Sequence, residues 1–194
     1  NLPDMRVLTT DNILFHNLCS KLATKVCNDG FLPDVIVGIA SGGSQVATIV
    51  AQHFKDAILT EVDIHRSTKR GKNSKISRKI LAMLPFRLLD WLRMAESYFC
   101  SIRKTAKRIG EVNFRTEITA KLAKGCKVLI VDDAIDSGTT MKLAVEEISQ
   151  KFPECTIRTA VITITTDHPV ILADYFIFND KTLIRFPWAI DAKI

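Results

Sequence analysis

Carboxylate and hydroxyl side chains gather in one short segment of the chain, and they are the residues best suited to chemistry. Two adjacent carboxylates, Asp132 and Asp133, follow the apolar run 128–131, and a third, Asp136, comes shortly after them. The segment continues with three hydroxyl side chains and one glycine: Ser137, Gly138, Thr139 and Thr140. The glycine permits close approach of the backbone to a ligand.

This order of residue types indicates a ribose phosphate as the ligand. Free N–H groups at the start of a helix, together with hydroxyl groups, are suited to a phosphate monoester. The carboxylates of Asp132 and Asp133 repel a phosphate, so they are better used on sugar hydroxyls or, through water, on Mg²⁺. The alternative is that the two aspartates only cap a loop and that Ser137 only begins a helix.

The elements that must position this segment alternate between strand and helix patterns. Apolar runs rich in β-branched residues predict strands at 34–40, 57–64, 127–131, 158–166 and 175–178. Helical spacing predicts helices at 11–28, where Asp11 can act as the cap, at 46–54 and at 140–151. A tight turn is expected at 41–44. This alternation predicts an α/β fold with a mainly parallel central sheet and helices on both faces.

The whole chain, residues 1–194, is predicted to be a single domain with an insertion at about 66–115. The insertion begins with a basic run at 66–79 and continues with a helical pattern. The net charge is +6 and the isoelectric point is near 9.1, which favours an anionic partner such as a nucleotide, pyrophosphate or nucleic acid.

Cysteine usage and hydropathy favour a cytoplasmic protein. The five cysteines are scattered and form no C-x-x-C pair, which is typical of reduced thiols. No signal peptide is visible at the first residues, and the apolar runs are shorter than the roughly 20 residues that a membrane span requires. We therefore expect no association with a membrane.

The segment 128–140 resembles the signature for phosphoribosyl pyrophosphate (PRPP) in type I phosphoribosyltransferases. The turn at 39–43 resembles the pyrophosphate loop of that family, and 186–188 resembles the ending of its xanthine–guanine branch. The resemblance covers most of the chain outside the insertion. It implies the family's fold, with a small C-terminal hood over the base, and it places the chain closest to the purine (xanthine–guanine and hypoxanthine) branch.

The resemblance also implies roles for individual residues. Asp132 and Asp133 would hold the ribose hydroxyls and, through water, Mg²⁺. The 5′-phosphate would be surrounded by Asp136, Ser137, Gly138, Thr139 and Thr140. Pyrophosphate would be bound by backbone groups of Ser41, Gly42 and Gly43.

The base-binding half of the site is implied by fewer residues. Asp136 would act as the general acid or base beside the purine ring; the alternative is that it only caps the helix that follows. Base contacts would come from Ile135, Leu183, Ile184 and Phe186, while Trp188 is expected to pack in the core. The branch usually carries a Lys after the strand 158–166, but this chain reads Thr-Thr-Asp-His at 165–168.

The implied activity is the Mg²⁺-dependent transfer of ribose 5-phosphate from PRPP to a nitrogenous base, a purine, with release of pyrophosphate. The implied partners are PRPP and a nucleobase, in a homodimer or higher homo-oligomer. An alternative remains open: a regulatory protein of the same fold that senses PRPP or a nucleotide and binds nucleic acid through the basic insertion.

Overall fold

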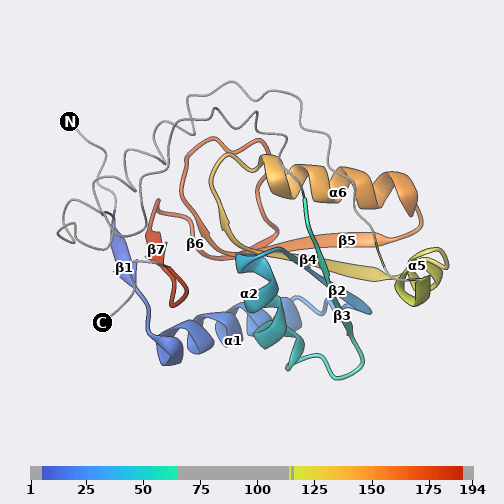
Figure 1. Ribbon diagram of the computed structural model, residues 1–194, viewed down its shortest axis with the longest axis horizontal. Helices are drawn as coiled ribbons and strands as arrows, with labels where there is room; N and C mark the ends of the chain where they lie inside the picture. Colours follow the sequence, from blue (N-terminus) through green and yellow to red (C-terminus); the bar gives the residue numbers. More distant parts are fainter. Residues whose placement is uncertain (1–5, 65–113, 115, 190–194) are drawn as a thin grey trace, which may run out of the picture.

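The computed structural model describes residues 6–64, 114 and 116–189, and its centre is a parallel five-stranded sheet (Figure 1). The strand order is β3-β2-β4-β5-β6, and every neighbouring pair in this sheet is parallel. The strands are β2 (Val35–Ile39), β3 (Ile58–Val62), β4 (Lys127–Ile135), β5 (Thr156–Ile164) and β6 (Tyr175–Phe178). The predicted α/β fold with a mainly parallel sheet is confirmed.

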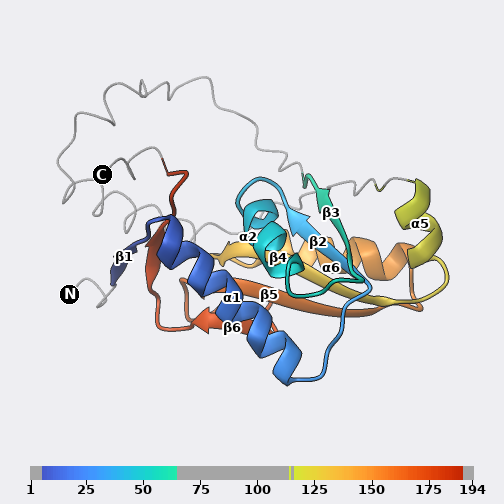
Figure 2. The same cartoon turned by 90° about the horizontal axis from the view of Figure 1, so that it is seen from below.

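Helices cover both faces of this sheet, as predicted. Figure 1 shows α6 (Thr139–Lys151) on one side and α1 (Asn12–Asn28) and α2 (Gly42–Ala51) on the other. A further short helix, α5 (Thr116–Leu122), packs on the α6 side through Ile118 and Leu122. Figure 2 shows α1 running across its face of the sheet. All five residues of β2 are buried because both faces are covered.

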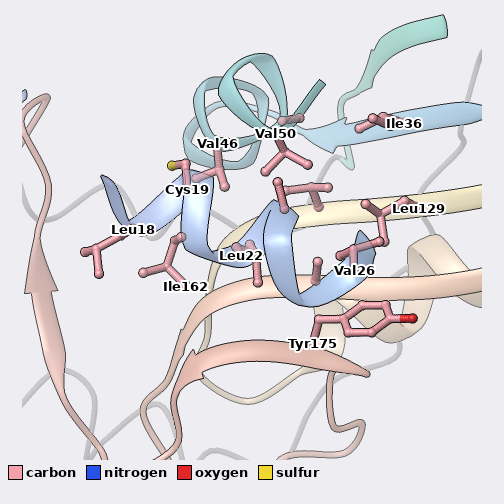
Figure 3. Close-up of a cluster of buried hydrophobic side chains, with 14 of the residues drawn as sticks. Leu18, Cys19, Leu22, Val26, Ile36, Val46, Val50, Leu129, Ile162 and Tyr175 are labelled. Atoms are coloured by element: carbon pink, nitrogen blue, oxygen red, sulfur yellow. The ribbon is translucent and has the colours of Figure 1, made fainter. Parts of the chain in front are cut away.

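The core on the α1 side is built from helix and strand residues that meet face to face. Figure 3 shows Leu22 and Val26 of α1 in one cluster with side chains of α2 and with Leu129 and Ile162 of the sheet. Leu22 and Val26 are fully buried. Each buried side chain of this size contributes about 1.5–3 kcal/mol relative to an exposed one, so this contact fixes α1 and α2 against the sheet.

Several predicted boundaries were correct and others were wrong. Asp11 does cap α1, since its Oδ1 accepts a hydrogen bond of 2.7 Å from the Leu14 N–H. The predicted turn at 41–44 and helix at 46–54 were wrong, because α2 already begins at Gly42 and ends at Ala51. Two glycines, which have low helix propensity, concealed this start. The predicted strand 127–131 was too short, because β4 continues to Ile135 and pairs with β5.

A second, two-stranded sheet lies apart from the main one, where the sequence predicted a small C-terminal hood (Figure 1). It pairs β1 (Val7–Thr9) with β7 (Leu183–Arg185) in parallel. The Arg185 carbonyl accepts hydrogen bonds of 3.0 Å from both the N–H and the hydroxyl of Thr10. Neither strand was predicted, because a three-residue strand carries too little pattern.

The predicted insertion at 66–115 falls outside the described residues, except for Phe114. The Phe114 ring meets the Phe152 ring edge to face, with centroids 6.2 Å apart. Within the described part of the chain, no helix has the length and apolar character needed to span a bilayer.

Candidate active site

The carboxylates of Asp132 and Asp133 lie at the carboxyl end of β4, in the middle of the main sheet. Both residues are half-buried, and the Asp133 N–H donates a 2.9 Å hydrogen bond to Asp132 Oδ1. In open α/β sheets, ligands bind outside the carboxyl ends of the strands. The two aspartates therefore occupy the part of the fold where a ligand is expected.

The start of α2 packs directly against these carboxylates, and only glycine fits there. A Cβ atom on Gly42 would lie 2.6 Å from Asp133 Cγ, and one on Gly43 would lie 2.6 Å from the Val131 carbonyl oxygen. Real Cβ atoms do not approach so closely. The predicted pyrophosphate turn and the predicted ribose-binding carboxylates, far apart in the sequence, are thus in contact. The preceding peptide bond, Ala40–Ser41, is cis.

Asp133 has the most perturbed carboxyl group of the site. Burial raises its pKa above the usual value of 3.8, and the charge of Asp136 adds to this rise. Hydrogen bonding with the Asp132 side chain and with the Ala134 backbone opposes the rise. An ionised Asp133 therefore has a strong demand for further hydrogen-bond donors or a cation, which a bound sugar or metal ion would supply.

The loop that follows β4 forms the amino-terminal end of α6. Gly138 has a φ of +77° and precedes the first helical residue, Thr139. A Cβ on Gly138 would lie 3.1 Å from the backbone N and O of Ile171, so its left-handed conformation and its close packing both require glycine. The hydroxyls of Ser137 and Thr139 lie 3.0 Å apart. Hydroxyls and helix N–H groups are thus assembled where a phosphate would bind.

Asp136 is exposed beside this loop, and it has a partner that the sequence did not single out. The hydroxyl of Thr165, at the end of β5, donates a hydrogen bond of 2.5 Å to Asp136 Oδ1. Thr165 itself is only 5% exposed. The sequence drew attention to the segment 165–168 at the end of a predicted strand. It did not predict the hydrogen bond between Thr165 and Asp136, because this contact joins two distant parts of the chain and leaves no signal in a single sequence.

The residues predicted to contact the base are buried. Ile135 lies in the core on the α6 side, whereas Ile184 and Phe186 lie in the core on the α1 side. The Phe186 ring stacks on Trp188 with centroids 4.7 Å apart and meets Phe15 edge to face. Core packing therefore accounts for the burial of Ile184 and Phe186, while Trp188 is half-buried and packs against the same core, as expected. The fourth predicted residue, Leu183, is buried in β7.

A lysine that the sequence analysis did not identify lies near the end of β5. Lys181 Nζ is 2.7 Å from Asp167 Oδ2, and Lys181 adopts a φ of 60°. The next residue, Thr182, is tied to β5 because its carbonyl accepts a 2.6 Å hydrogen bond from the Thr163 hydroxyl. An ammonium group thus stands beside the segment in which a lysine was expected and not found.

The acidic residues fit Mg²⁺ only in part. Among the described residues, no three His, Cys, Asp or Glu side chains come together closely enough to hold an ion by themselves. Asp132 and Asp133 provide hard oxygen ligands, and Mg²⁺ is commonly bound by one or two carboxylates together with phosphates and water. The site therefore fits an ion that takes its remaining ligands from the substrate.

Comparison with solved structures shows the same fold in purine-handling enzymes. A purine phosphoribosyltransferase from Pyrococcus horikoshii Ot3 matches with a TM-score of 0.61 and 19% identity, covering 94% of each chain. The Helicobacter pylori xanthine-guanine-hypoxanthine phosphoribosyltransferase matches with a TM-score of 0.58 and 16% identity, covering 96% of this chain and 95% of that one.

A Neisseria gonorrhoeae protein with bound ppGpp is similar as well, with a TM-score of 0.62 and 17% identity over 94% of this chain and 89% of that one. At these identities, the likeness is one of fold. No curated protein matches the chain by sequence. The phosphoribosyl transferase domain family, however, matches residues 9–191. That span includes the glycine turn, the carboxylates of β4 and the loop before α6, and the chain belongs to the phosphoribosyltransferase domain family.

Proposed function

We propose that this protein transfers the ribose 5-phosphate of PRPP to a purine base and releases pyrophosphate. The observation that carries the proposal is the packing of Gly42 and Gly43 against Asp132 and Asp133, next to the loop that begins α6. We assign pyrophosphate to the start of α2, the ribose hydroxyls to the two carboxylates, and the 5′-phosphate to the loop before α6. PRPP requires these three elements in one place.

Each part of PRPP has a matching group. The carboxylates of Asp132 and Asp133 accept hydrogen bonds from the ribose hydroxyls. The hydroxyls of Ser137 and Thr139 and the amino-terminal end of α6 bind the 5′-phosphate. The backbone at Gly42 and Gly43, at the start of α2, binds the pyrophosphate.

The reaction exchanges one bond at C1′ for another. The C1′–O bond breaks with its electron pair on pyrophosphate, and a ring nitrogen of the base forms the new bond to C1′. Asp136 accepts the ring proton that the base loses. When bound, Mg²⁺ supplies positive charge that neutralises the leaving pyrophosphate.

The choice of a purine rests on Asp136 and on the pair Lys181–Asp167. An ammonium group donates to a ring carbonyl, and a carboxylate accepts from a ring N–H, so this pair suits a base that carries both. The names of the Pyrococcus and Helicobacter proteins, which mention purines, agree with this choice.

Pyrophosphate release from PRPP, measured with a panel of hypoxanthine, xanthine, guanine, adenine and orotate, tests the proposal. We expect turnover with at least one oxopurine and loss of turnover in EDTA. Binding of PRPP without turnover of any base would contradict it. That outcome would favour the regulatory alternative, for which salt-dependent nucleic-acid binding that requires the basic residues at 66–79 is the further test.

A further inference from the structure

Thr165 presents a buried hydroxyl to an exposed carboxylate. Its side chain is 5% exposed, and its Oγ1 lies 2.5 Å from Asp136 Oδ1 and 3.3 Å from the Ile135 carbonyl oxygen. A hydroxyl has one proton to donate. The shorter contact, to a charged acceptor, is the stronger of the two, so the proton is directed at Asp136.

The backbone holds Thr165 firmly in register with the loop that it contacts. The Thr165 N–H donates a 2.9 Å hydrogen bond to the Ile135 carbonyl, which extends the pairing of β4 with β5 by one step. Thr165 is therefore fixed to the residue that precedes Asp136. Its hydroxyl has little freedom to move away from the carboxylate.

Asp136 needs such a support because it is exposed and follows the last residue of β4. An exposed carboxylate samples several rotamers, and a group that must accept a proton from a bound base works best when one rotamer is fixed. The hydrogen bond from Thr165 engages Oδ1. This contact leaves Oδ2 to accept a proton from the substrate.

We infer that Thr165 is a positioning residue for Asp136, acting through this hydrogen bond; the inference rests on the proposed transfer to a purine. It predicts that removal of the Thr165 hydroxyl slows the chemical step and leaves PRPP binding intact. Displacement of a reacting group by about 1 Å costs on the order of 100-fold in rate, which sets the scale of the effect.

The chain contains a matched control on β5, the strand that Thr165 follows. The Thr159 hydroxyl donates a 2.8 Å hydrogen bond to Asp174 Oδ2, and Thr159 is 3% exposed. Thr159 lies toward the amino end of β5, whereas Thr165 follows its carboxyl end. The substitution Thr159→Val therefore removes a buried threonine-to-aspartate hydrogen bond away from the proposed site.

The experiment compares kcat, KM for PRPP and thermal unfolding in the wild type, Thr165→Val, Thr165→Ser and Thr159→Val. We expect kcat to fall about 10- to 100-fold in Thr165→Val with an unchanged KM for PRPP, and to recover in Thr165→Ser. Thr159→Val should lower the unfolding temperature and keep its kcat. A kcat in Thr165→Val within twofold of the wild type, or an equal loss in Thr159→Val, would overturn the inference.

A double-mutant cycle separates positioning from a general structural effect. If Thr165 acts through Asp136, Thr165→Val should cause no further loss of kcat in an Asp136→Asn background. Fully additive losses would overturn the inference. If the wild type releases no pyrophosphate with any purine, the proposed function fails, and the inference falls with it. If the wild type turns over and only the Thr165 results disagree, the proposed function stands.

Discussion

Asp136 is the residue on which the proposed chemistry depends most directly. We expect Asp136→Asn to lower kcat by about 100- to 10,000-fold, because an amide cannot accept the ring proton, while PRPP affinity changes little. Steady-state assays of pyrophosphate release and direct binding of PRPP measure the two effects. Asp174→Asn is the matched control, because Asp174, like Asp136, accepts a hydrogen bond from a threonine hydroxyl, that of Thr159 in β5. Equal turnover in the wild type and Asp136→Asn would remove Asp136 from the reaction.

Asp133 illustrates how a binding residue can reduce the stability of the free protein. Its pKa is raised by burial, so the folded state favours the protonated carboxyl. The contribution of Asp133 to stability is then greatest below the usual pKa of 3.8 and is lost as the pH rises through the pKa of the folded state. An ionised Asp133 without a ligand therefore destabilises the fold.

We expect Asp133→Asn to stabilise the protein in EDTA at neutral pH by about 1 kcal/mol, or about 2–4 °C in Tm, and to abolish PRPP binding. The gain should grow as the pH rises from about 4 and then level off, since asparagine does not titrate. Thermal unfolding between pH 4 and pH 8 measures it. A gain that is the same at every pH would show that burial of the charge is not its cause.

The first residues of α2 are suited to close contact with the carboxylates of β4 rather than to starting a helix. The two glycines form a poor helix start, but they allow the helix to contact the carboxylates of β4. Gly42→Ala should destabilise the protein by about 1–3 kcal/mol through overpacking. It should also weaken PRPP binding at least tenfold, because either α2 or the Asp133 carboxylate must move.

Ser44→Ala is the control for this substitution. Ser44 lies in the first turn of α2, and its buried hydroxyl has no hydrogen-bond partner among the residues that the structure describes. Its loss should leave stability and PRPP binding close to those of the wild type. Calorimetric titration with PRPP and thermal unfolding distinguish the two variants. A Gly42→Ala protein with wild-type affinity would contradict the close approach.

At the scale of the whole molecule, the pKa values and the exposure of the cysteine thiols reflect how the layers are packed. Burial raises the pKa of Cys19, a core residue of α1, to about 12. Burial and the neighbouring Cys155 raise the pKa of Cys126 to about 12, and the two sulfur atoms lie 3.9 Å apart. Cys27, by contrast, is exposed at the end of α1. Reactivity depends on the thiolate form.

We therefore expect a small alkylating reagent at pH 8 to modify Cys27 faster than Cys19 and Cys126, while these three react alike in denaturant. Peptide mass spectrometry over time measures the three rates. Modification of Cys126 as fast as that of Cys27 would contradict the packing described for the amino ends of β4 and β5.

The oligomeric state, predicted to be a dimer or larger, is measured by sedimentation of the same protein.

Local patterns in the sequence were sufficient for much of the fold. The apolar runs predicted strands near the observed β2 to β6, and Asp11 predicted the cap of α1. Both signals are contained in a short segment: a doubly buried strand is a continuous apolar run, and a cap lies beside the first turn of its helix. The segment 128–140 likewise identified the family, since its carboxylates and hydroxyls follow one another directly.

Contacts between distant segments were decided only by the tertiary structure. The pairing of β1 with β7, the approach of Gly42 to Asp133, the hydrogen bond from Thr165 to Asp136 and the pair Lys181–Asp167 each join residues far apart in the chain. Such contacts depend on how the sheet orders its strands, and no local pattern encodes them. The sequence by itself therefore determined the type of site, while the packing of β4, β5 and α2 decided which side chains meet there.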